Sequence, residues 1–137
     1  MQVATESYAA TAAGVRAAIA AYTQAVDDGR RGDIAALFCA DGWADLPSAG
    51  VVVGRMALDA LFRGEKPPSE SRHIVTSTHI TRWSADHAVA ISDLVIVGAG
   101  DGEPWAFRSV GRYFDLLHRW DGGWRFHSRT LRFVDDA

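Results

Sequence analysis

A histidine near the middle of the chain suits proton transfer, and the residues around it indicate how it is presented. Residues 72–80 read RHIVTSTHI, and so many β-branched residues predict a strand. Alternation along this strand places His73, Val75, Ser77 and His79 on one face. An imidazole moves protons near neutral pH but needs a partner that fixes its tautomer. The pattern therefore predicts a base on a strand, and its partner must be found.

Asp93 is the carboxylate that the next predicted strand offers to His73. If the hairpin closes around Ala85, Asp93 lies opposite Ser77, roughly 13 Å along the sheet from His73 at ~3.3 Å per residue. That distance excludes a direct hydrogen bond unless a bulge shifts the register, so the partner should come from another element. Asp93 itself must pair with an arginine, reach solvent or line a wet pocket, because an isolated buried carboxylate is unfavourable.

The histidines do not indicate a metal site. His73 and His79 would lie ~20 Å apart on one strand, whereas the ligands of one ion lie within a few ångströms of each other. The chain also lacks the H-E-x-x-H and paired C-x-x-C signatures. We therefore expect no metal, and we interpret His79, His87, His118 and His127 as surface or structural residues.

Asp27 lies near the end of the first predicted helix, which runs over residues 8–28. An apolar stripe with i, i+4, i+7, i+11 spacing begins at Val15 and includes Tyr22. Asp27 is five residues beyond Tyr22, about 140° around the helix. Periodicity alone favours a solvated Asp27, unless the helix ends over the rim of the sheet. Asp28 lies farther from the stripe and is the weaker candidate.

Arg129 has two interpretations, which the sequence leaves open. If Trp120 pairs with Trp124 in the last hairpin, Asp115 lies opposite Arg129. The first interpretation is a cross-strand ion pair. The second is a fixed cation that stabilises an enolate, a carboxylate or a departing anion.

The order of elements indicates the fold class. A short helix is expected from Asp33, with Asp33 as its N-cap, and short strands at residues 43–46 and 51–53 flank a turn. A helix over residues 55–62 and a loop follow. Strands are then expected at about 72–82, 87–98, 105–119 and 124–134, which is the α+β pattern. A curved sheet covered by helices leaves a concave pocket.

Composition bounds the class of protein. The 137 residues, 48% hydrophobic and 23% charged, predict one globular domain over residues 1–137. A net charge of -3 argues against nucleic acid as a partner. Cys39 is the single cysteine and is interpreted as buried rather than nucleophilic. No apolar run approaches the ~20 residues of a membrane helix, and no signal peptide is recognised, so we expect a cytoplasmic protein.

Four segments of the chain resemble the SnoaL-like branch of the nuclear-transport-factor-2-like superfamily. They are YTQAVDDGRRGDIAALFCADGWAD, the G-R-x-A-L of residues 54–58, RHIVTSTHI, and the terminal GRYFDLLHRWDGGWRFHSRTL. The resemblance implies a cone-shaped α+β barrel, with three N-terminal helices packed on a strongly curved mixed or antiparallel sheet that encloses a pocket. The chain looks most similar to cofactor-independent lyases and isomerases such as scytalone dehydratase, bile-acid 7α-dehydratase and hexachlorocyclohexane dehydrochlorinase.

The resemblance also implies roles for individual residues. It makes His73 the base, Asp27 its partner, and Tyr22 and Arg129 the groups that stabilise an anion or protonate a leaving hydroxyl. No organic cofactor or metal is then needed.

Three further residues are expected to bind substrate. Trp43 would stack on a flat substrate near the pocket mouth. Asp93 falls near a position that is acidic in some members of the superfamily, and Ser77 stands where members often have asparagine.

The expected reaction is removal of a carbon-bound proton from a small hydrophobic polyketide, steroid-like or aromatic substrate, followed by elimination. The resemblance implies a homodimer or homotrimer. Two alternatives remain open: a ligand-binding module or a dioxygenase β-subunit-like assembly module without catalysis, and the aldol ring closure of polyketide cyclases.

Overall fold

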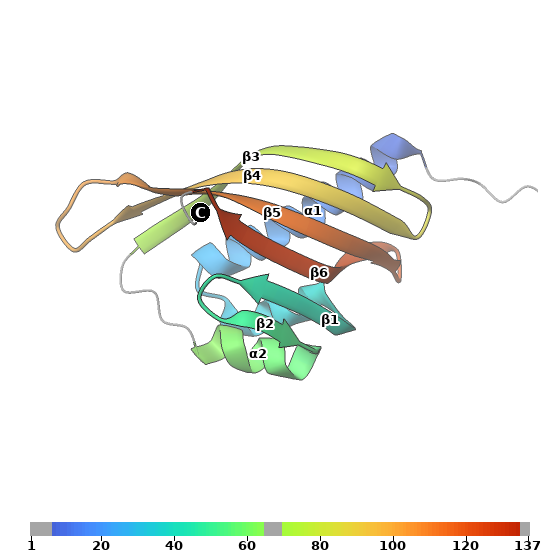
Figure 1. Ribbon diagram of the computed structural model, residues 1–137, viewed down its shortest axis with the longest axis horizontal. Coiled ribbons are helices and arrows are strands. Elements are labelled where there is room, and N and C mark those ends of the chain that lie inside the picture. The colour runs from blue at the N-terminus through green and yellow to red at the C-terminus, as the bar shows by residue number, and fades with distance from the viewer. Residues whose placement is uncertain (1–6, 65–69, 135–137) are drawn as a thin grey trace, which may run out of the picture.

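Helices come first along the chain, and strands form most of its second half (Figure 1). The structure is a computed structural model, and it describes residues 7–64 and 70–134. The loop that we predicted after the second helix lies mostly outside the described residues. The helical elements are α1 (Tyr8–Asp27), the 3-10 turns Arg31–Asp33 and Ala35–Leu37, and α2 (Arg55–Gly64). The strands are β1 (Phe38–Leu46), β2 (Gly50–Val53), β3 (Glu70–Trp83), β4 (His87–Ala99), β5 (Ala106–Trp120) and β6 (Gly123–Phe133).

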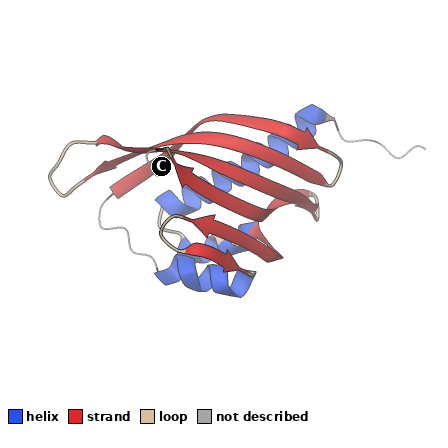
Figure 2. Cartoon of the chain, in the orientation of Figure 1, coloured by secondary structure: helices blue, strands red, loops and turns tan. Residues whose placement is uncertain are grey.

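The strands form one six-stranded sheet in the order β2-β1-β6-β5-β4-β3. Among the strands of residues 7–64 and 70–134, only the β1–β6 pair is parallel, so the sheet is mixed. Figure 2 shows α1 crossing one face of the sheet and α2 lying beside β2. The predicted α+β fold with helices on a curved mixed sheet is confirmed. The sheet is open rather than a closed barrel, because β2 and β3 form its two edges.

The first helix is held on the sheet by its apolar stripe. Ser7 caps its N-terminus by accepting a hydrogen bond from the Ala10 amide at 3.1 Å. Val15, Ile19 and Tyr22 are all buried, as their spacing predicts. None of the helices in residues 7–64 and 70–134 combines the length and the apolar character of a membrane span.

The predicted short helix from Asp33 is wrong. The structure has only two 3-10 turns there, and neither has a side-chain cap bond. Asp33 instead accepts a hydrogen bond from Arg30 at 3.2 Å. The segment is too short for an α-helix, because β1 begins at Phe38 and leaves room for single turns only.

A bulge in β3 changes which side chains face α1. The β3–β4 register shifts between Val75 and Ser77, and an extra residue reverses the alternation beyond it. His73 and Val75 are half-buried, whereas Ser77 and His79 are exposed. Asp93 does lie opposite Ser77, as predicted. The prediction that all four β3 residues share one face is therefore wrong beyond Val75.

Candidate active site

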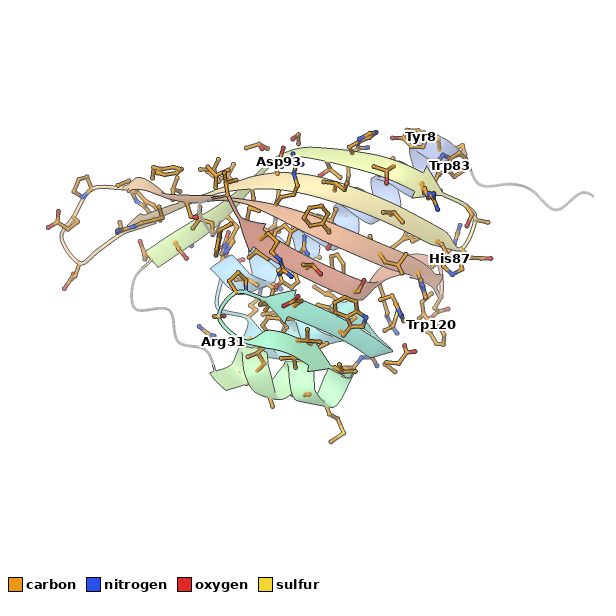
Figure 3. All side chains as sticks on the ribbon, viewed as in Figure 1. Tyr8, Arg31, Trp83, His87, Asp93 and Trp120 are labelled. Carbon is orange, nitrogen blue, oxygen red and sulfur yellow. The ribbon has the colours of Figure 1, made fainter. Side chains whose placement is uncertain are left out.

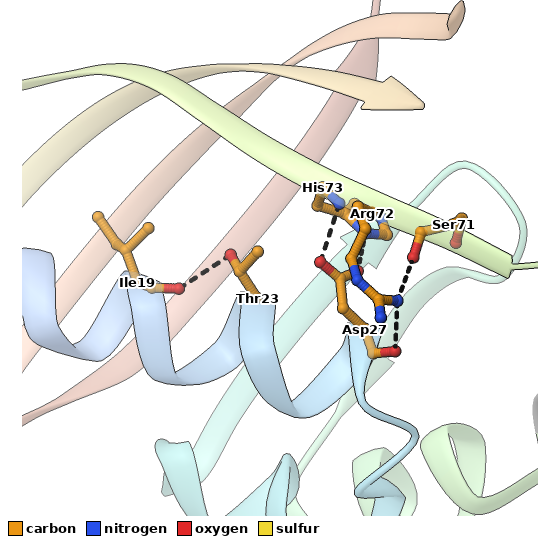
Figure 4. Close-up of polar contacts among 6 residues, drawn as sticks. All are labelled: Ile19, Thr23, Asp27, Ser71, Arg72 and His73. Carbon is orange, nitrogen blue, oxygen red and sulfur yellow. Dashed lines mark hydrogen bonds and ion pairs between the residues drawn. The ribbon is translucent and has the colours of Figure 1, made fainter. Parts of the chain in front are cut away.

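The end of α1 and the beginning of β3 bring His73 and Asp27 together (Figure 4). Nδ1 of His73 lies 2.6 Å from Oδ1 of Asp27. The backbone amide of His73 donates a second hydrogen bond to Oδ2 of Asp27, at 2.9 Å. Both side chains are largely buried, with 17% of His73 and 8% of Asp27 exposed. This contact fixes the ring through Nδ1, so Asp27 does not engage Nε2 of His73.

The local fold explains why Asp27 reaches β3. Asp27 is the last residue of α1, so its side chain points beyond the helix toward the start of the neighbouring strand. Arg72 donates from Nη1 to the Asp27 carbonyl oxygen at 3.1 Å and to the Ser71 carbonyl oxygen at 2.9 Å (Figure 4). Gly29 then leaves the helix with a φ of 71°. The helix therefore ends over the rim of the sheet, which was the condition for Asp27 to reach a pocket.

We call His73 and Asp27 the dyad. A cavity of about 680 Å³ opens beside it, and His73 forms part of the cavity wall. Tyr22 and Tyr113 also line it, and their rings meet edge to face with centroids 6.2 Å apart. Most of the remaining lining is apolar: Val26, Ile34, Leu46, Phe62, Leu131 and Phe133. The volume and the lining suit a small hydrophobic ligand.

Tyr113 and Arg31 are site residues that sequence reasoning missed. Tyr113 shares the inward face of β5 with Asp115, so strand alternation could have found it. Burial raises the pKa of the Tyr113 hydroxyl, which therefore keeps its proton. Arg31 lies in the 3-10 turn beside the cavity (Figure 3) and donates to the Phe62 carbonyl oxygen at 3.0 Å. Among the described residues that line the cavity, Arg31 is the single cation.

Arg129 forms the cross-strand ion pair that was the first of its two interpretations. Nε and Nη2 of Arg129 donate to the two carboxylate oxygens of Asp115 at 3.0 and 3.3 Å. The guanidinium carbon lies 3.5 Å from the ring centre of Tyr113 and 4.2 Å from that of Tyr22. Both side chains of the ion pair are fully buried, and Arg129 is absent from the described cavity lining. Arg129 thus lies behind Tyr22 and Tyr113, which form the aromatic wall of the cavity, rather than in the cavity itself.

The buried ion pair predicts how stability depends on pH. Burial raises the pKa of Asp115 from 3.8 to about 6, although Arg129 opposes the shift. Between these values Asp115 holds a proton in the folded chain that the unfolded chain has released, so the contribution of Asp115 to the free energy of unfolding should fall as pH rises. Urea titrations across this range should show a larger fall for wild type than for Asp115→Asn. Equal slopes for the two proteins would contradict the raised pKa.

The three predicted substrate-binding residues are not brought to this cavity. Trp43 lies on the face of β1 opposite the buried Ala44 and Leu46, because side chains alternate along the strand. Asp93 accepts hydrogen bonds from Nε and Nη2 of Arg112 at 2.6 and 3.1 Å on the outer surface (Figure 3). These bonds lower the pKa of Asp93.

Ser77 lies beside a separate hollow of about 400 Å³ between α1 and β3. The bulge after Val75 accounts for this placement, because it turns Ser77 away from the face that carries His73. Ser77 would lie next to the dyad, where it could bind substrate, only if side chains alternated along β3 without a bulge.

Comparison with known proteins identifies similar folds. A family model described as a SnoaL-like domain matches residues 7–130. No curated protein is similar enough in sequence to be matched. A protein of unknown function from Mycobacterium tuberculosis superposes with a TM-score of 0.80 at 25% identity, over 90% of this chain and 71% of that chain.

Two other solved structures are named for activities. A candidate scytalone dehydratase from Novosphingobium aromaticivorans superposes with a TM-score of 0.78 at 22% identity, over 90% of this chain and 84% of that one. A hexachlorocyclohexane dehydrochlorinase superposes with a TM-score of 0.77 at 21% identity, over 92% of this chain and 86% of that one. These likenesses establish the fold.

Proposed function

The chain belongs to the SnoaL-like domain family, and on this premise we propose that it is a cofactor-independent lyase or isomerase whose base is His73, oriented by Asp27. The favoured reaction is elimination from a small hydrophobic substrate. The observation that carries the proposal is the 2.6 Å contact between Nδ1 of His73 and Oδ1 of Asp27 at the wall of a cavity of about 680 Å³.

The proton transfer follows from this contact. Asp27 accepts the Nδ1 proton of neutral His73, so the unprotonated Nε2 takes a proton from a carbon next to a carbonyl group or an electron-poor ring. The electrons of the broken C–H bond form a double bond as the leaving group departs from the neighbouring carbon. Asp27 offsets the positive charge that forms on the imidazole.

The cavity wall supplies groups for the departing anion. The hydroxyls of Tyr22 and Tyr113 would donate a proton or a hydrogen bond to it, and the raised pKa of Tyr113 keeps that proton available. Arg31 takes over the role that the sequence suggested for Arg129, because it lines the cavity and Arg129 does not. A positioned cation stabilises a developing negative charge.

Two relatives support elimination as the favoured reaction. One solved structure of the same fold is named a hexachlorocyclohexane dehydrochlorinase and another a candidate scytalone dehydratase. Loss of HCl and loss of water both begin here with removal of a carbon-bound proton, which is the step that the dyad suits. The mostly apolar cavity lining supports a hydrophobic substrate for this chain as well.

Proton abstraction can be tested with generic probes. The flat aromatic 5-nitrobenzisoxazole opens when a base removes its carbon-bound proton, and hexachlorocyclohexane releases chloride on elimination. Wild-type protein should open or dehalogenate at least one probe with saturation kinetics. Binding of both probes by calorimetry without turnover would contradict catalysis and favour the ligand-binding alternative.

A further inference from the structure

A cysteine and two histidines from three adjacent strands gather on the sheet, away from the cavity. They are Cys39 of β1, His118 of β5 and His127 of β6. The Cys39 sulfur and a ring nitrogen of each histidine all lie within 4.8 Å of one another. Within residues 7–64 and 70–134, this is the only such group of three or more side chains. From this group we propose a zinc site that fastens β1 to β5 and β6.

One cysteine and two histidines are ligand types that favour zinc. Thiolate and imidazole together suit Zn²⁺, at about 2.3 Å for sulfur and 2.0–2.1 Å for nitrogen. Around a tetrahedral ion these lengths place the ligand atoms roughly 3.3–3.7 Å apart. The observed atoms therefore need to approach by at most about 1–1.5 Å, which rotation of the side chains supplies. The carboxylate of Asp41 lies 3.9 Å from Nδ1 of His127, and it would hold a water in the fourth position.

The present contacts of these side chains leave them available to an ion. Nδ1 of His127 is buried without a hydrogen-bond partner among the described residues, which is rare for a buried polar atom. The one hydrogen-bond contact of the Cys39 sulfur with a described residue is with the Arg125 carbonyl oxygen, at 4.0 Å. The rings of His118 and His127 are stacked, with centroids 4.5 Å apart. The two rings therefore lie face to face, and a turn of each about its Cβ–Cγ bond would aim its nitrogen at a shared ion.

The backbone is irregular in both ladders at this place. Between β1 and β6, Phe38 pairs with Phe126 and Trp43 with Ser128. Residues 39–42 of β1 therefore span the same stretch of the ladder as the single residue His127 of β6. Between β5 and β6, Leu116 pairs with Ser128 and Leu117 with Phe126, which makes His127 the extra residue of a bulge. Bulges of this kind re-aim side chains and are common at functional sites.

Gly42 allows β1 to lie this close to β6. A Cβ added there would lie 3.0 Å from the carbonyl oxygens of both Cys39 and Phe126. The backbone therefore packs tightly where ladder hydrogen bonds are interrupted. An ion bound by Cys39 and His127 would restore a link between these two strands, which is a structural role independent of His73.

His87 extends the cluster from the neighbouring strand. Its ring meets that of His118 edge to face, with centroids 4.5 Å apart. Figure 3 labels His87 and Trp120 near the end of the sheet where β5 turns into β6, far from the labelled Arg31 beside the cavity. The position of the cluster therefore separates the metal site from the site of the proposed reaction.

Cobalt titration of the chelator-treated full chain tests the proposal. Co²⁺ should bind at one ion per chain and give a thiolate-to-cobalt charge-transfer band that Zn²⁺ abolishes by competition. Cys39→Ser should lose this band, and His127→Ala should weaken zinc affinity by at least the ~10- to 100-fold that a second-shell change costs. His79→Ala and His73→Ala should bind zinc as wild type does. Absence of the band from wild type, or its persistence in Cys39→Ser, would overturn the site.

Wild-type protein alone provides a second test. Cys39 is the only cysteine, so alkylation by iodoacetamide, followed by mass spectrometry, reports on this thiol without any variant. Stoichiometric zinc should slow the alkylation at least ten-fold, whereas magnesium should not. An alkylation rate unaffected by zinc would contradict the site, whatever the outcome of the elimination assays.

Discussion

Replacing His73 with alanine should lower turnover of the elimination probes by about 10²- to 10⁴-fold, the usual contribution of a positioned general base. The loss should appear in kcat with little change in KM, because the base interacts with the proton only as it is transferred. Initial rates with 5-nitrobenzisoxazole would measure it. His79→Ala is the matched control, since His79 lies on the same strand but is exposed beyond the bulge.

Asp27→Asn should reduce turnover to a similar extent although it keeps the shape of the side chain. Its amide oxygen can still accept from the His73 backbone N–H, which turns the amide NH₂ toward Nδ1. The neutral ring must then carry its proton on Nε2, where it can no longer accept one from a substrate. Asp28→Asn, one residue away and about half exposed, should leave turnover unchanged. A fully active Asp27→Asn would exclude Asp27 as the orienting partner.

Replacing Arg129 with methionine should destabilise the protein by about 3–5 kcal/mol, because it leaves Asp115 buried without its partner. Both side chains of the pair are fully buried, and the guanidinium also stacks on Tyr113 and Tyr22. The midpoint of urea unfolding would measure the loss. If Arg129 were instead a cavity cation, the variant would lose turnover while keeping its stability, and that outcome would contradict its placement behind the wall.

Two comparisons isolate the contribution of the ion pair. In a double-mutant cycle, Arg129→Met with Asp115→Asn should be less destabilising than the sum of the single changes, because each single change leaves one buried group unpaired. Arg112→Met removes the corresponding pair with Asp93, where the side chains are 51% and 40% exposed. That variant should unfold at nearly the wild-type urea concentration, because exposed pairs contribute little.

The sequence predicted the dyad partly by elimination and partly by resemblance. Strand spacing removed Asp93 as the partner of His73, and the resemblance to the SnoaL-like branch pointed to Asp27. Helical periodicity had favoured a solvated Asp27, because Asp27 is about 140° from Tyr22 around the helix. Periodicity describes residues inside a helix, but Asp27 is the terminal residue of α1 and faces β3 from its end. A terminal position depends on tertiary packing, which periodicity does not contain.

Bulges limited what strand alternation could predict. Asp115 opposite Arg129 and Asp93 opposite Ser77 were both predicted and are both observed. Ser77 nevertheless faces away from His73, because one extra residue in β3 reverses the alternation between Val75 and Ser77. Bulges also explain why the group of Cys39, His118 and His127 was not predicted. Its members are distant in sequence and meet only through two irregular ladders.

Nitrogen-15 NMR of the histidine rings tests most directly whether Asp27 makes Nε2 of His73 the base. At a pH where the imidazole is neutral, long-range proton–nitrogen spectra distinguish the two tautomers of each ring. We predict that His73 carries its proton on Nδ1, facing Asp27, and that this preference is lost in Asp27→Asn. A wild-type His73 protonated on Nε2, or one that exchanges between both tautomers, would contradict the proposed mechanism.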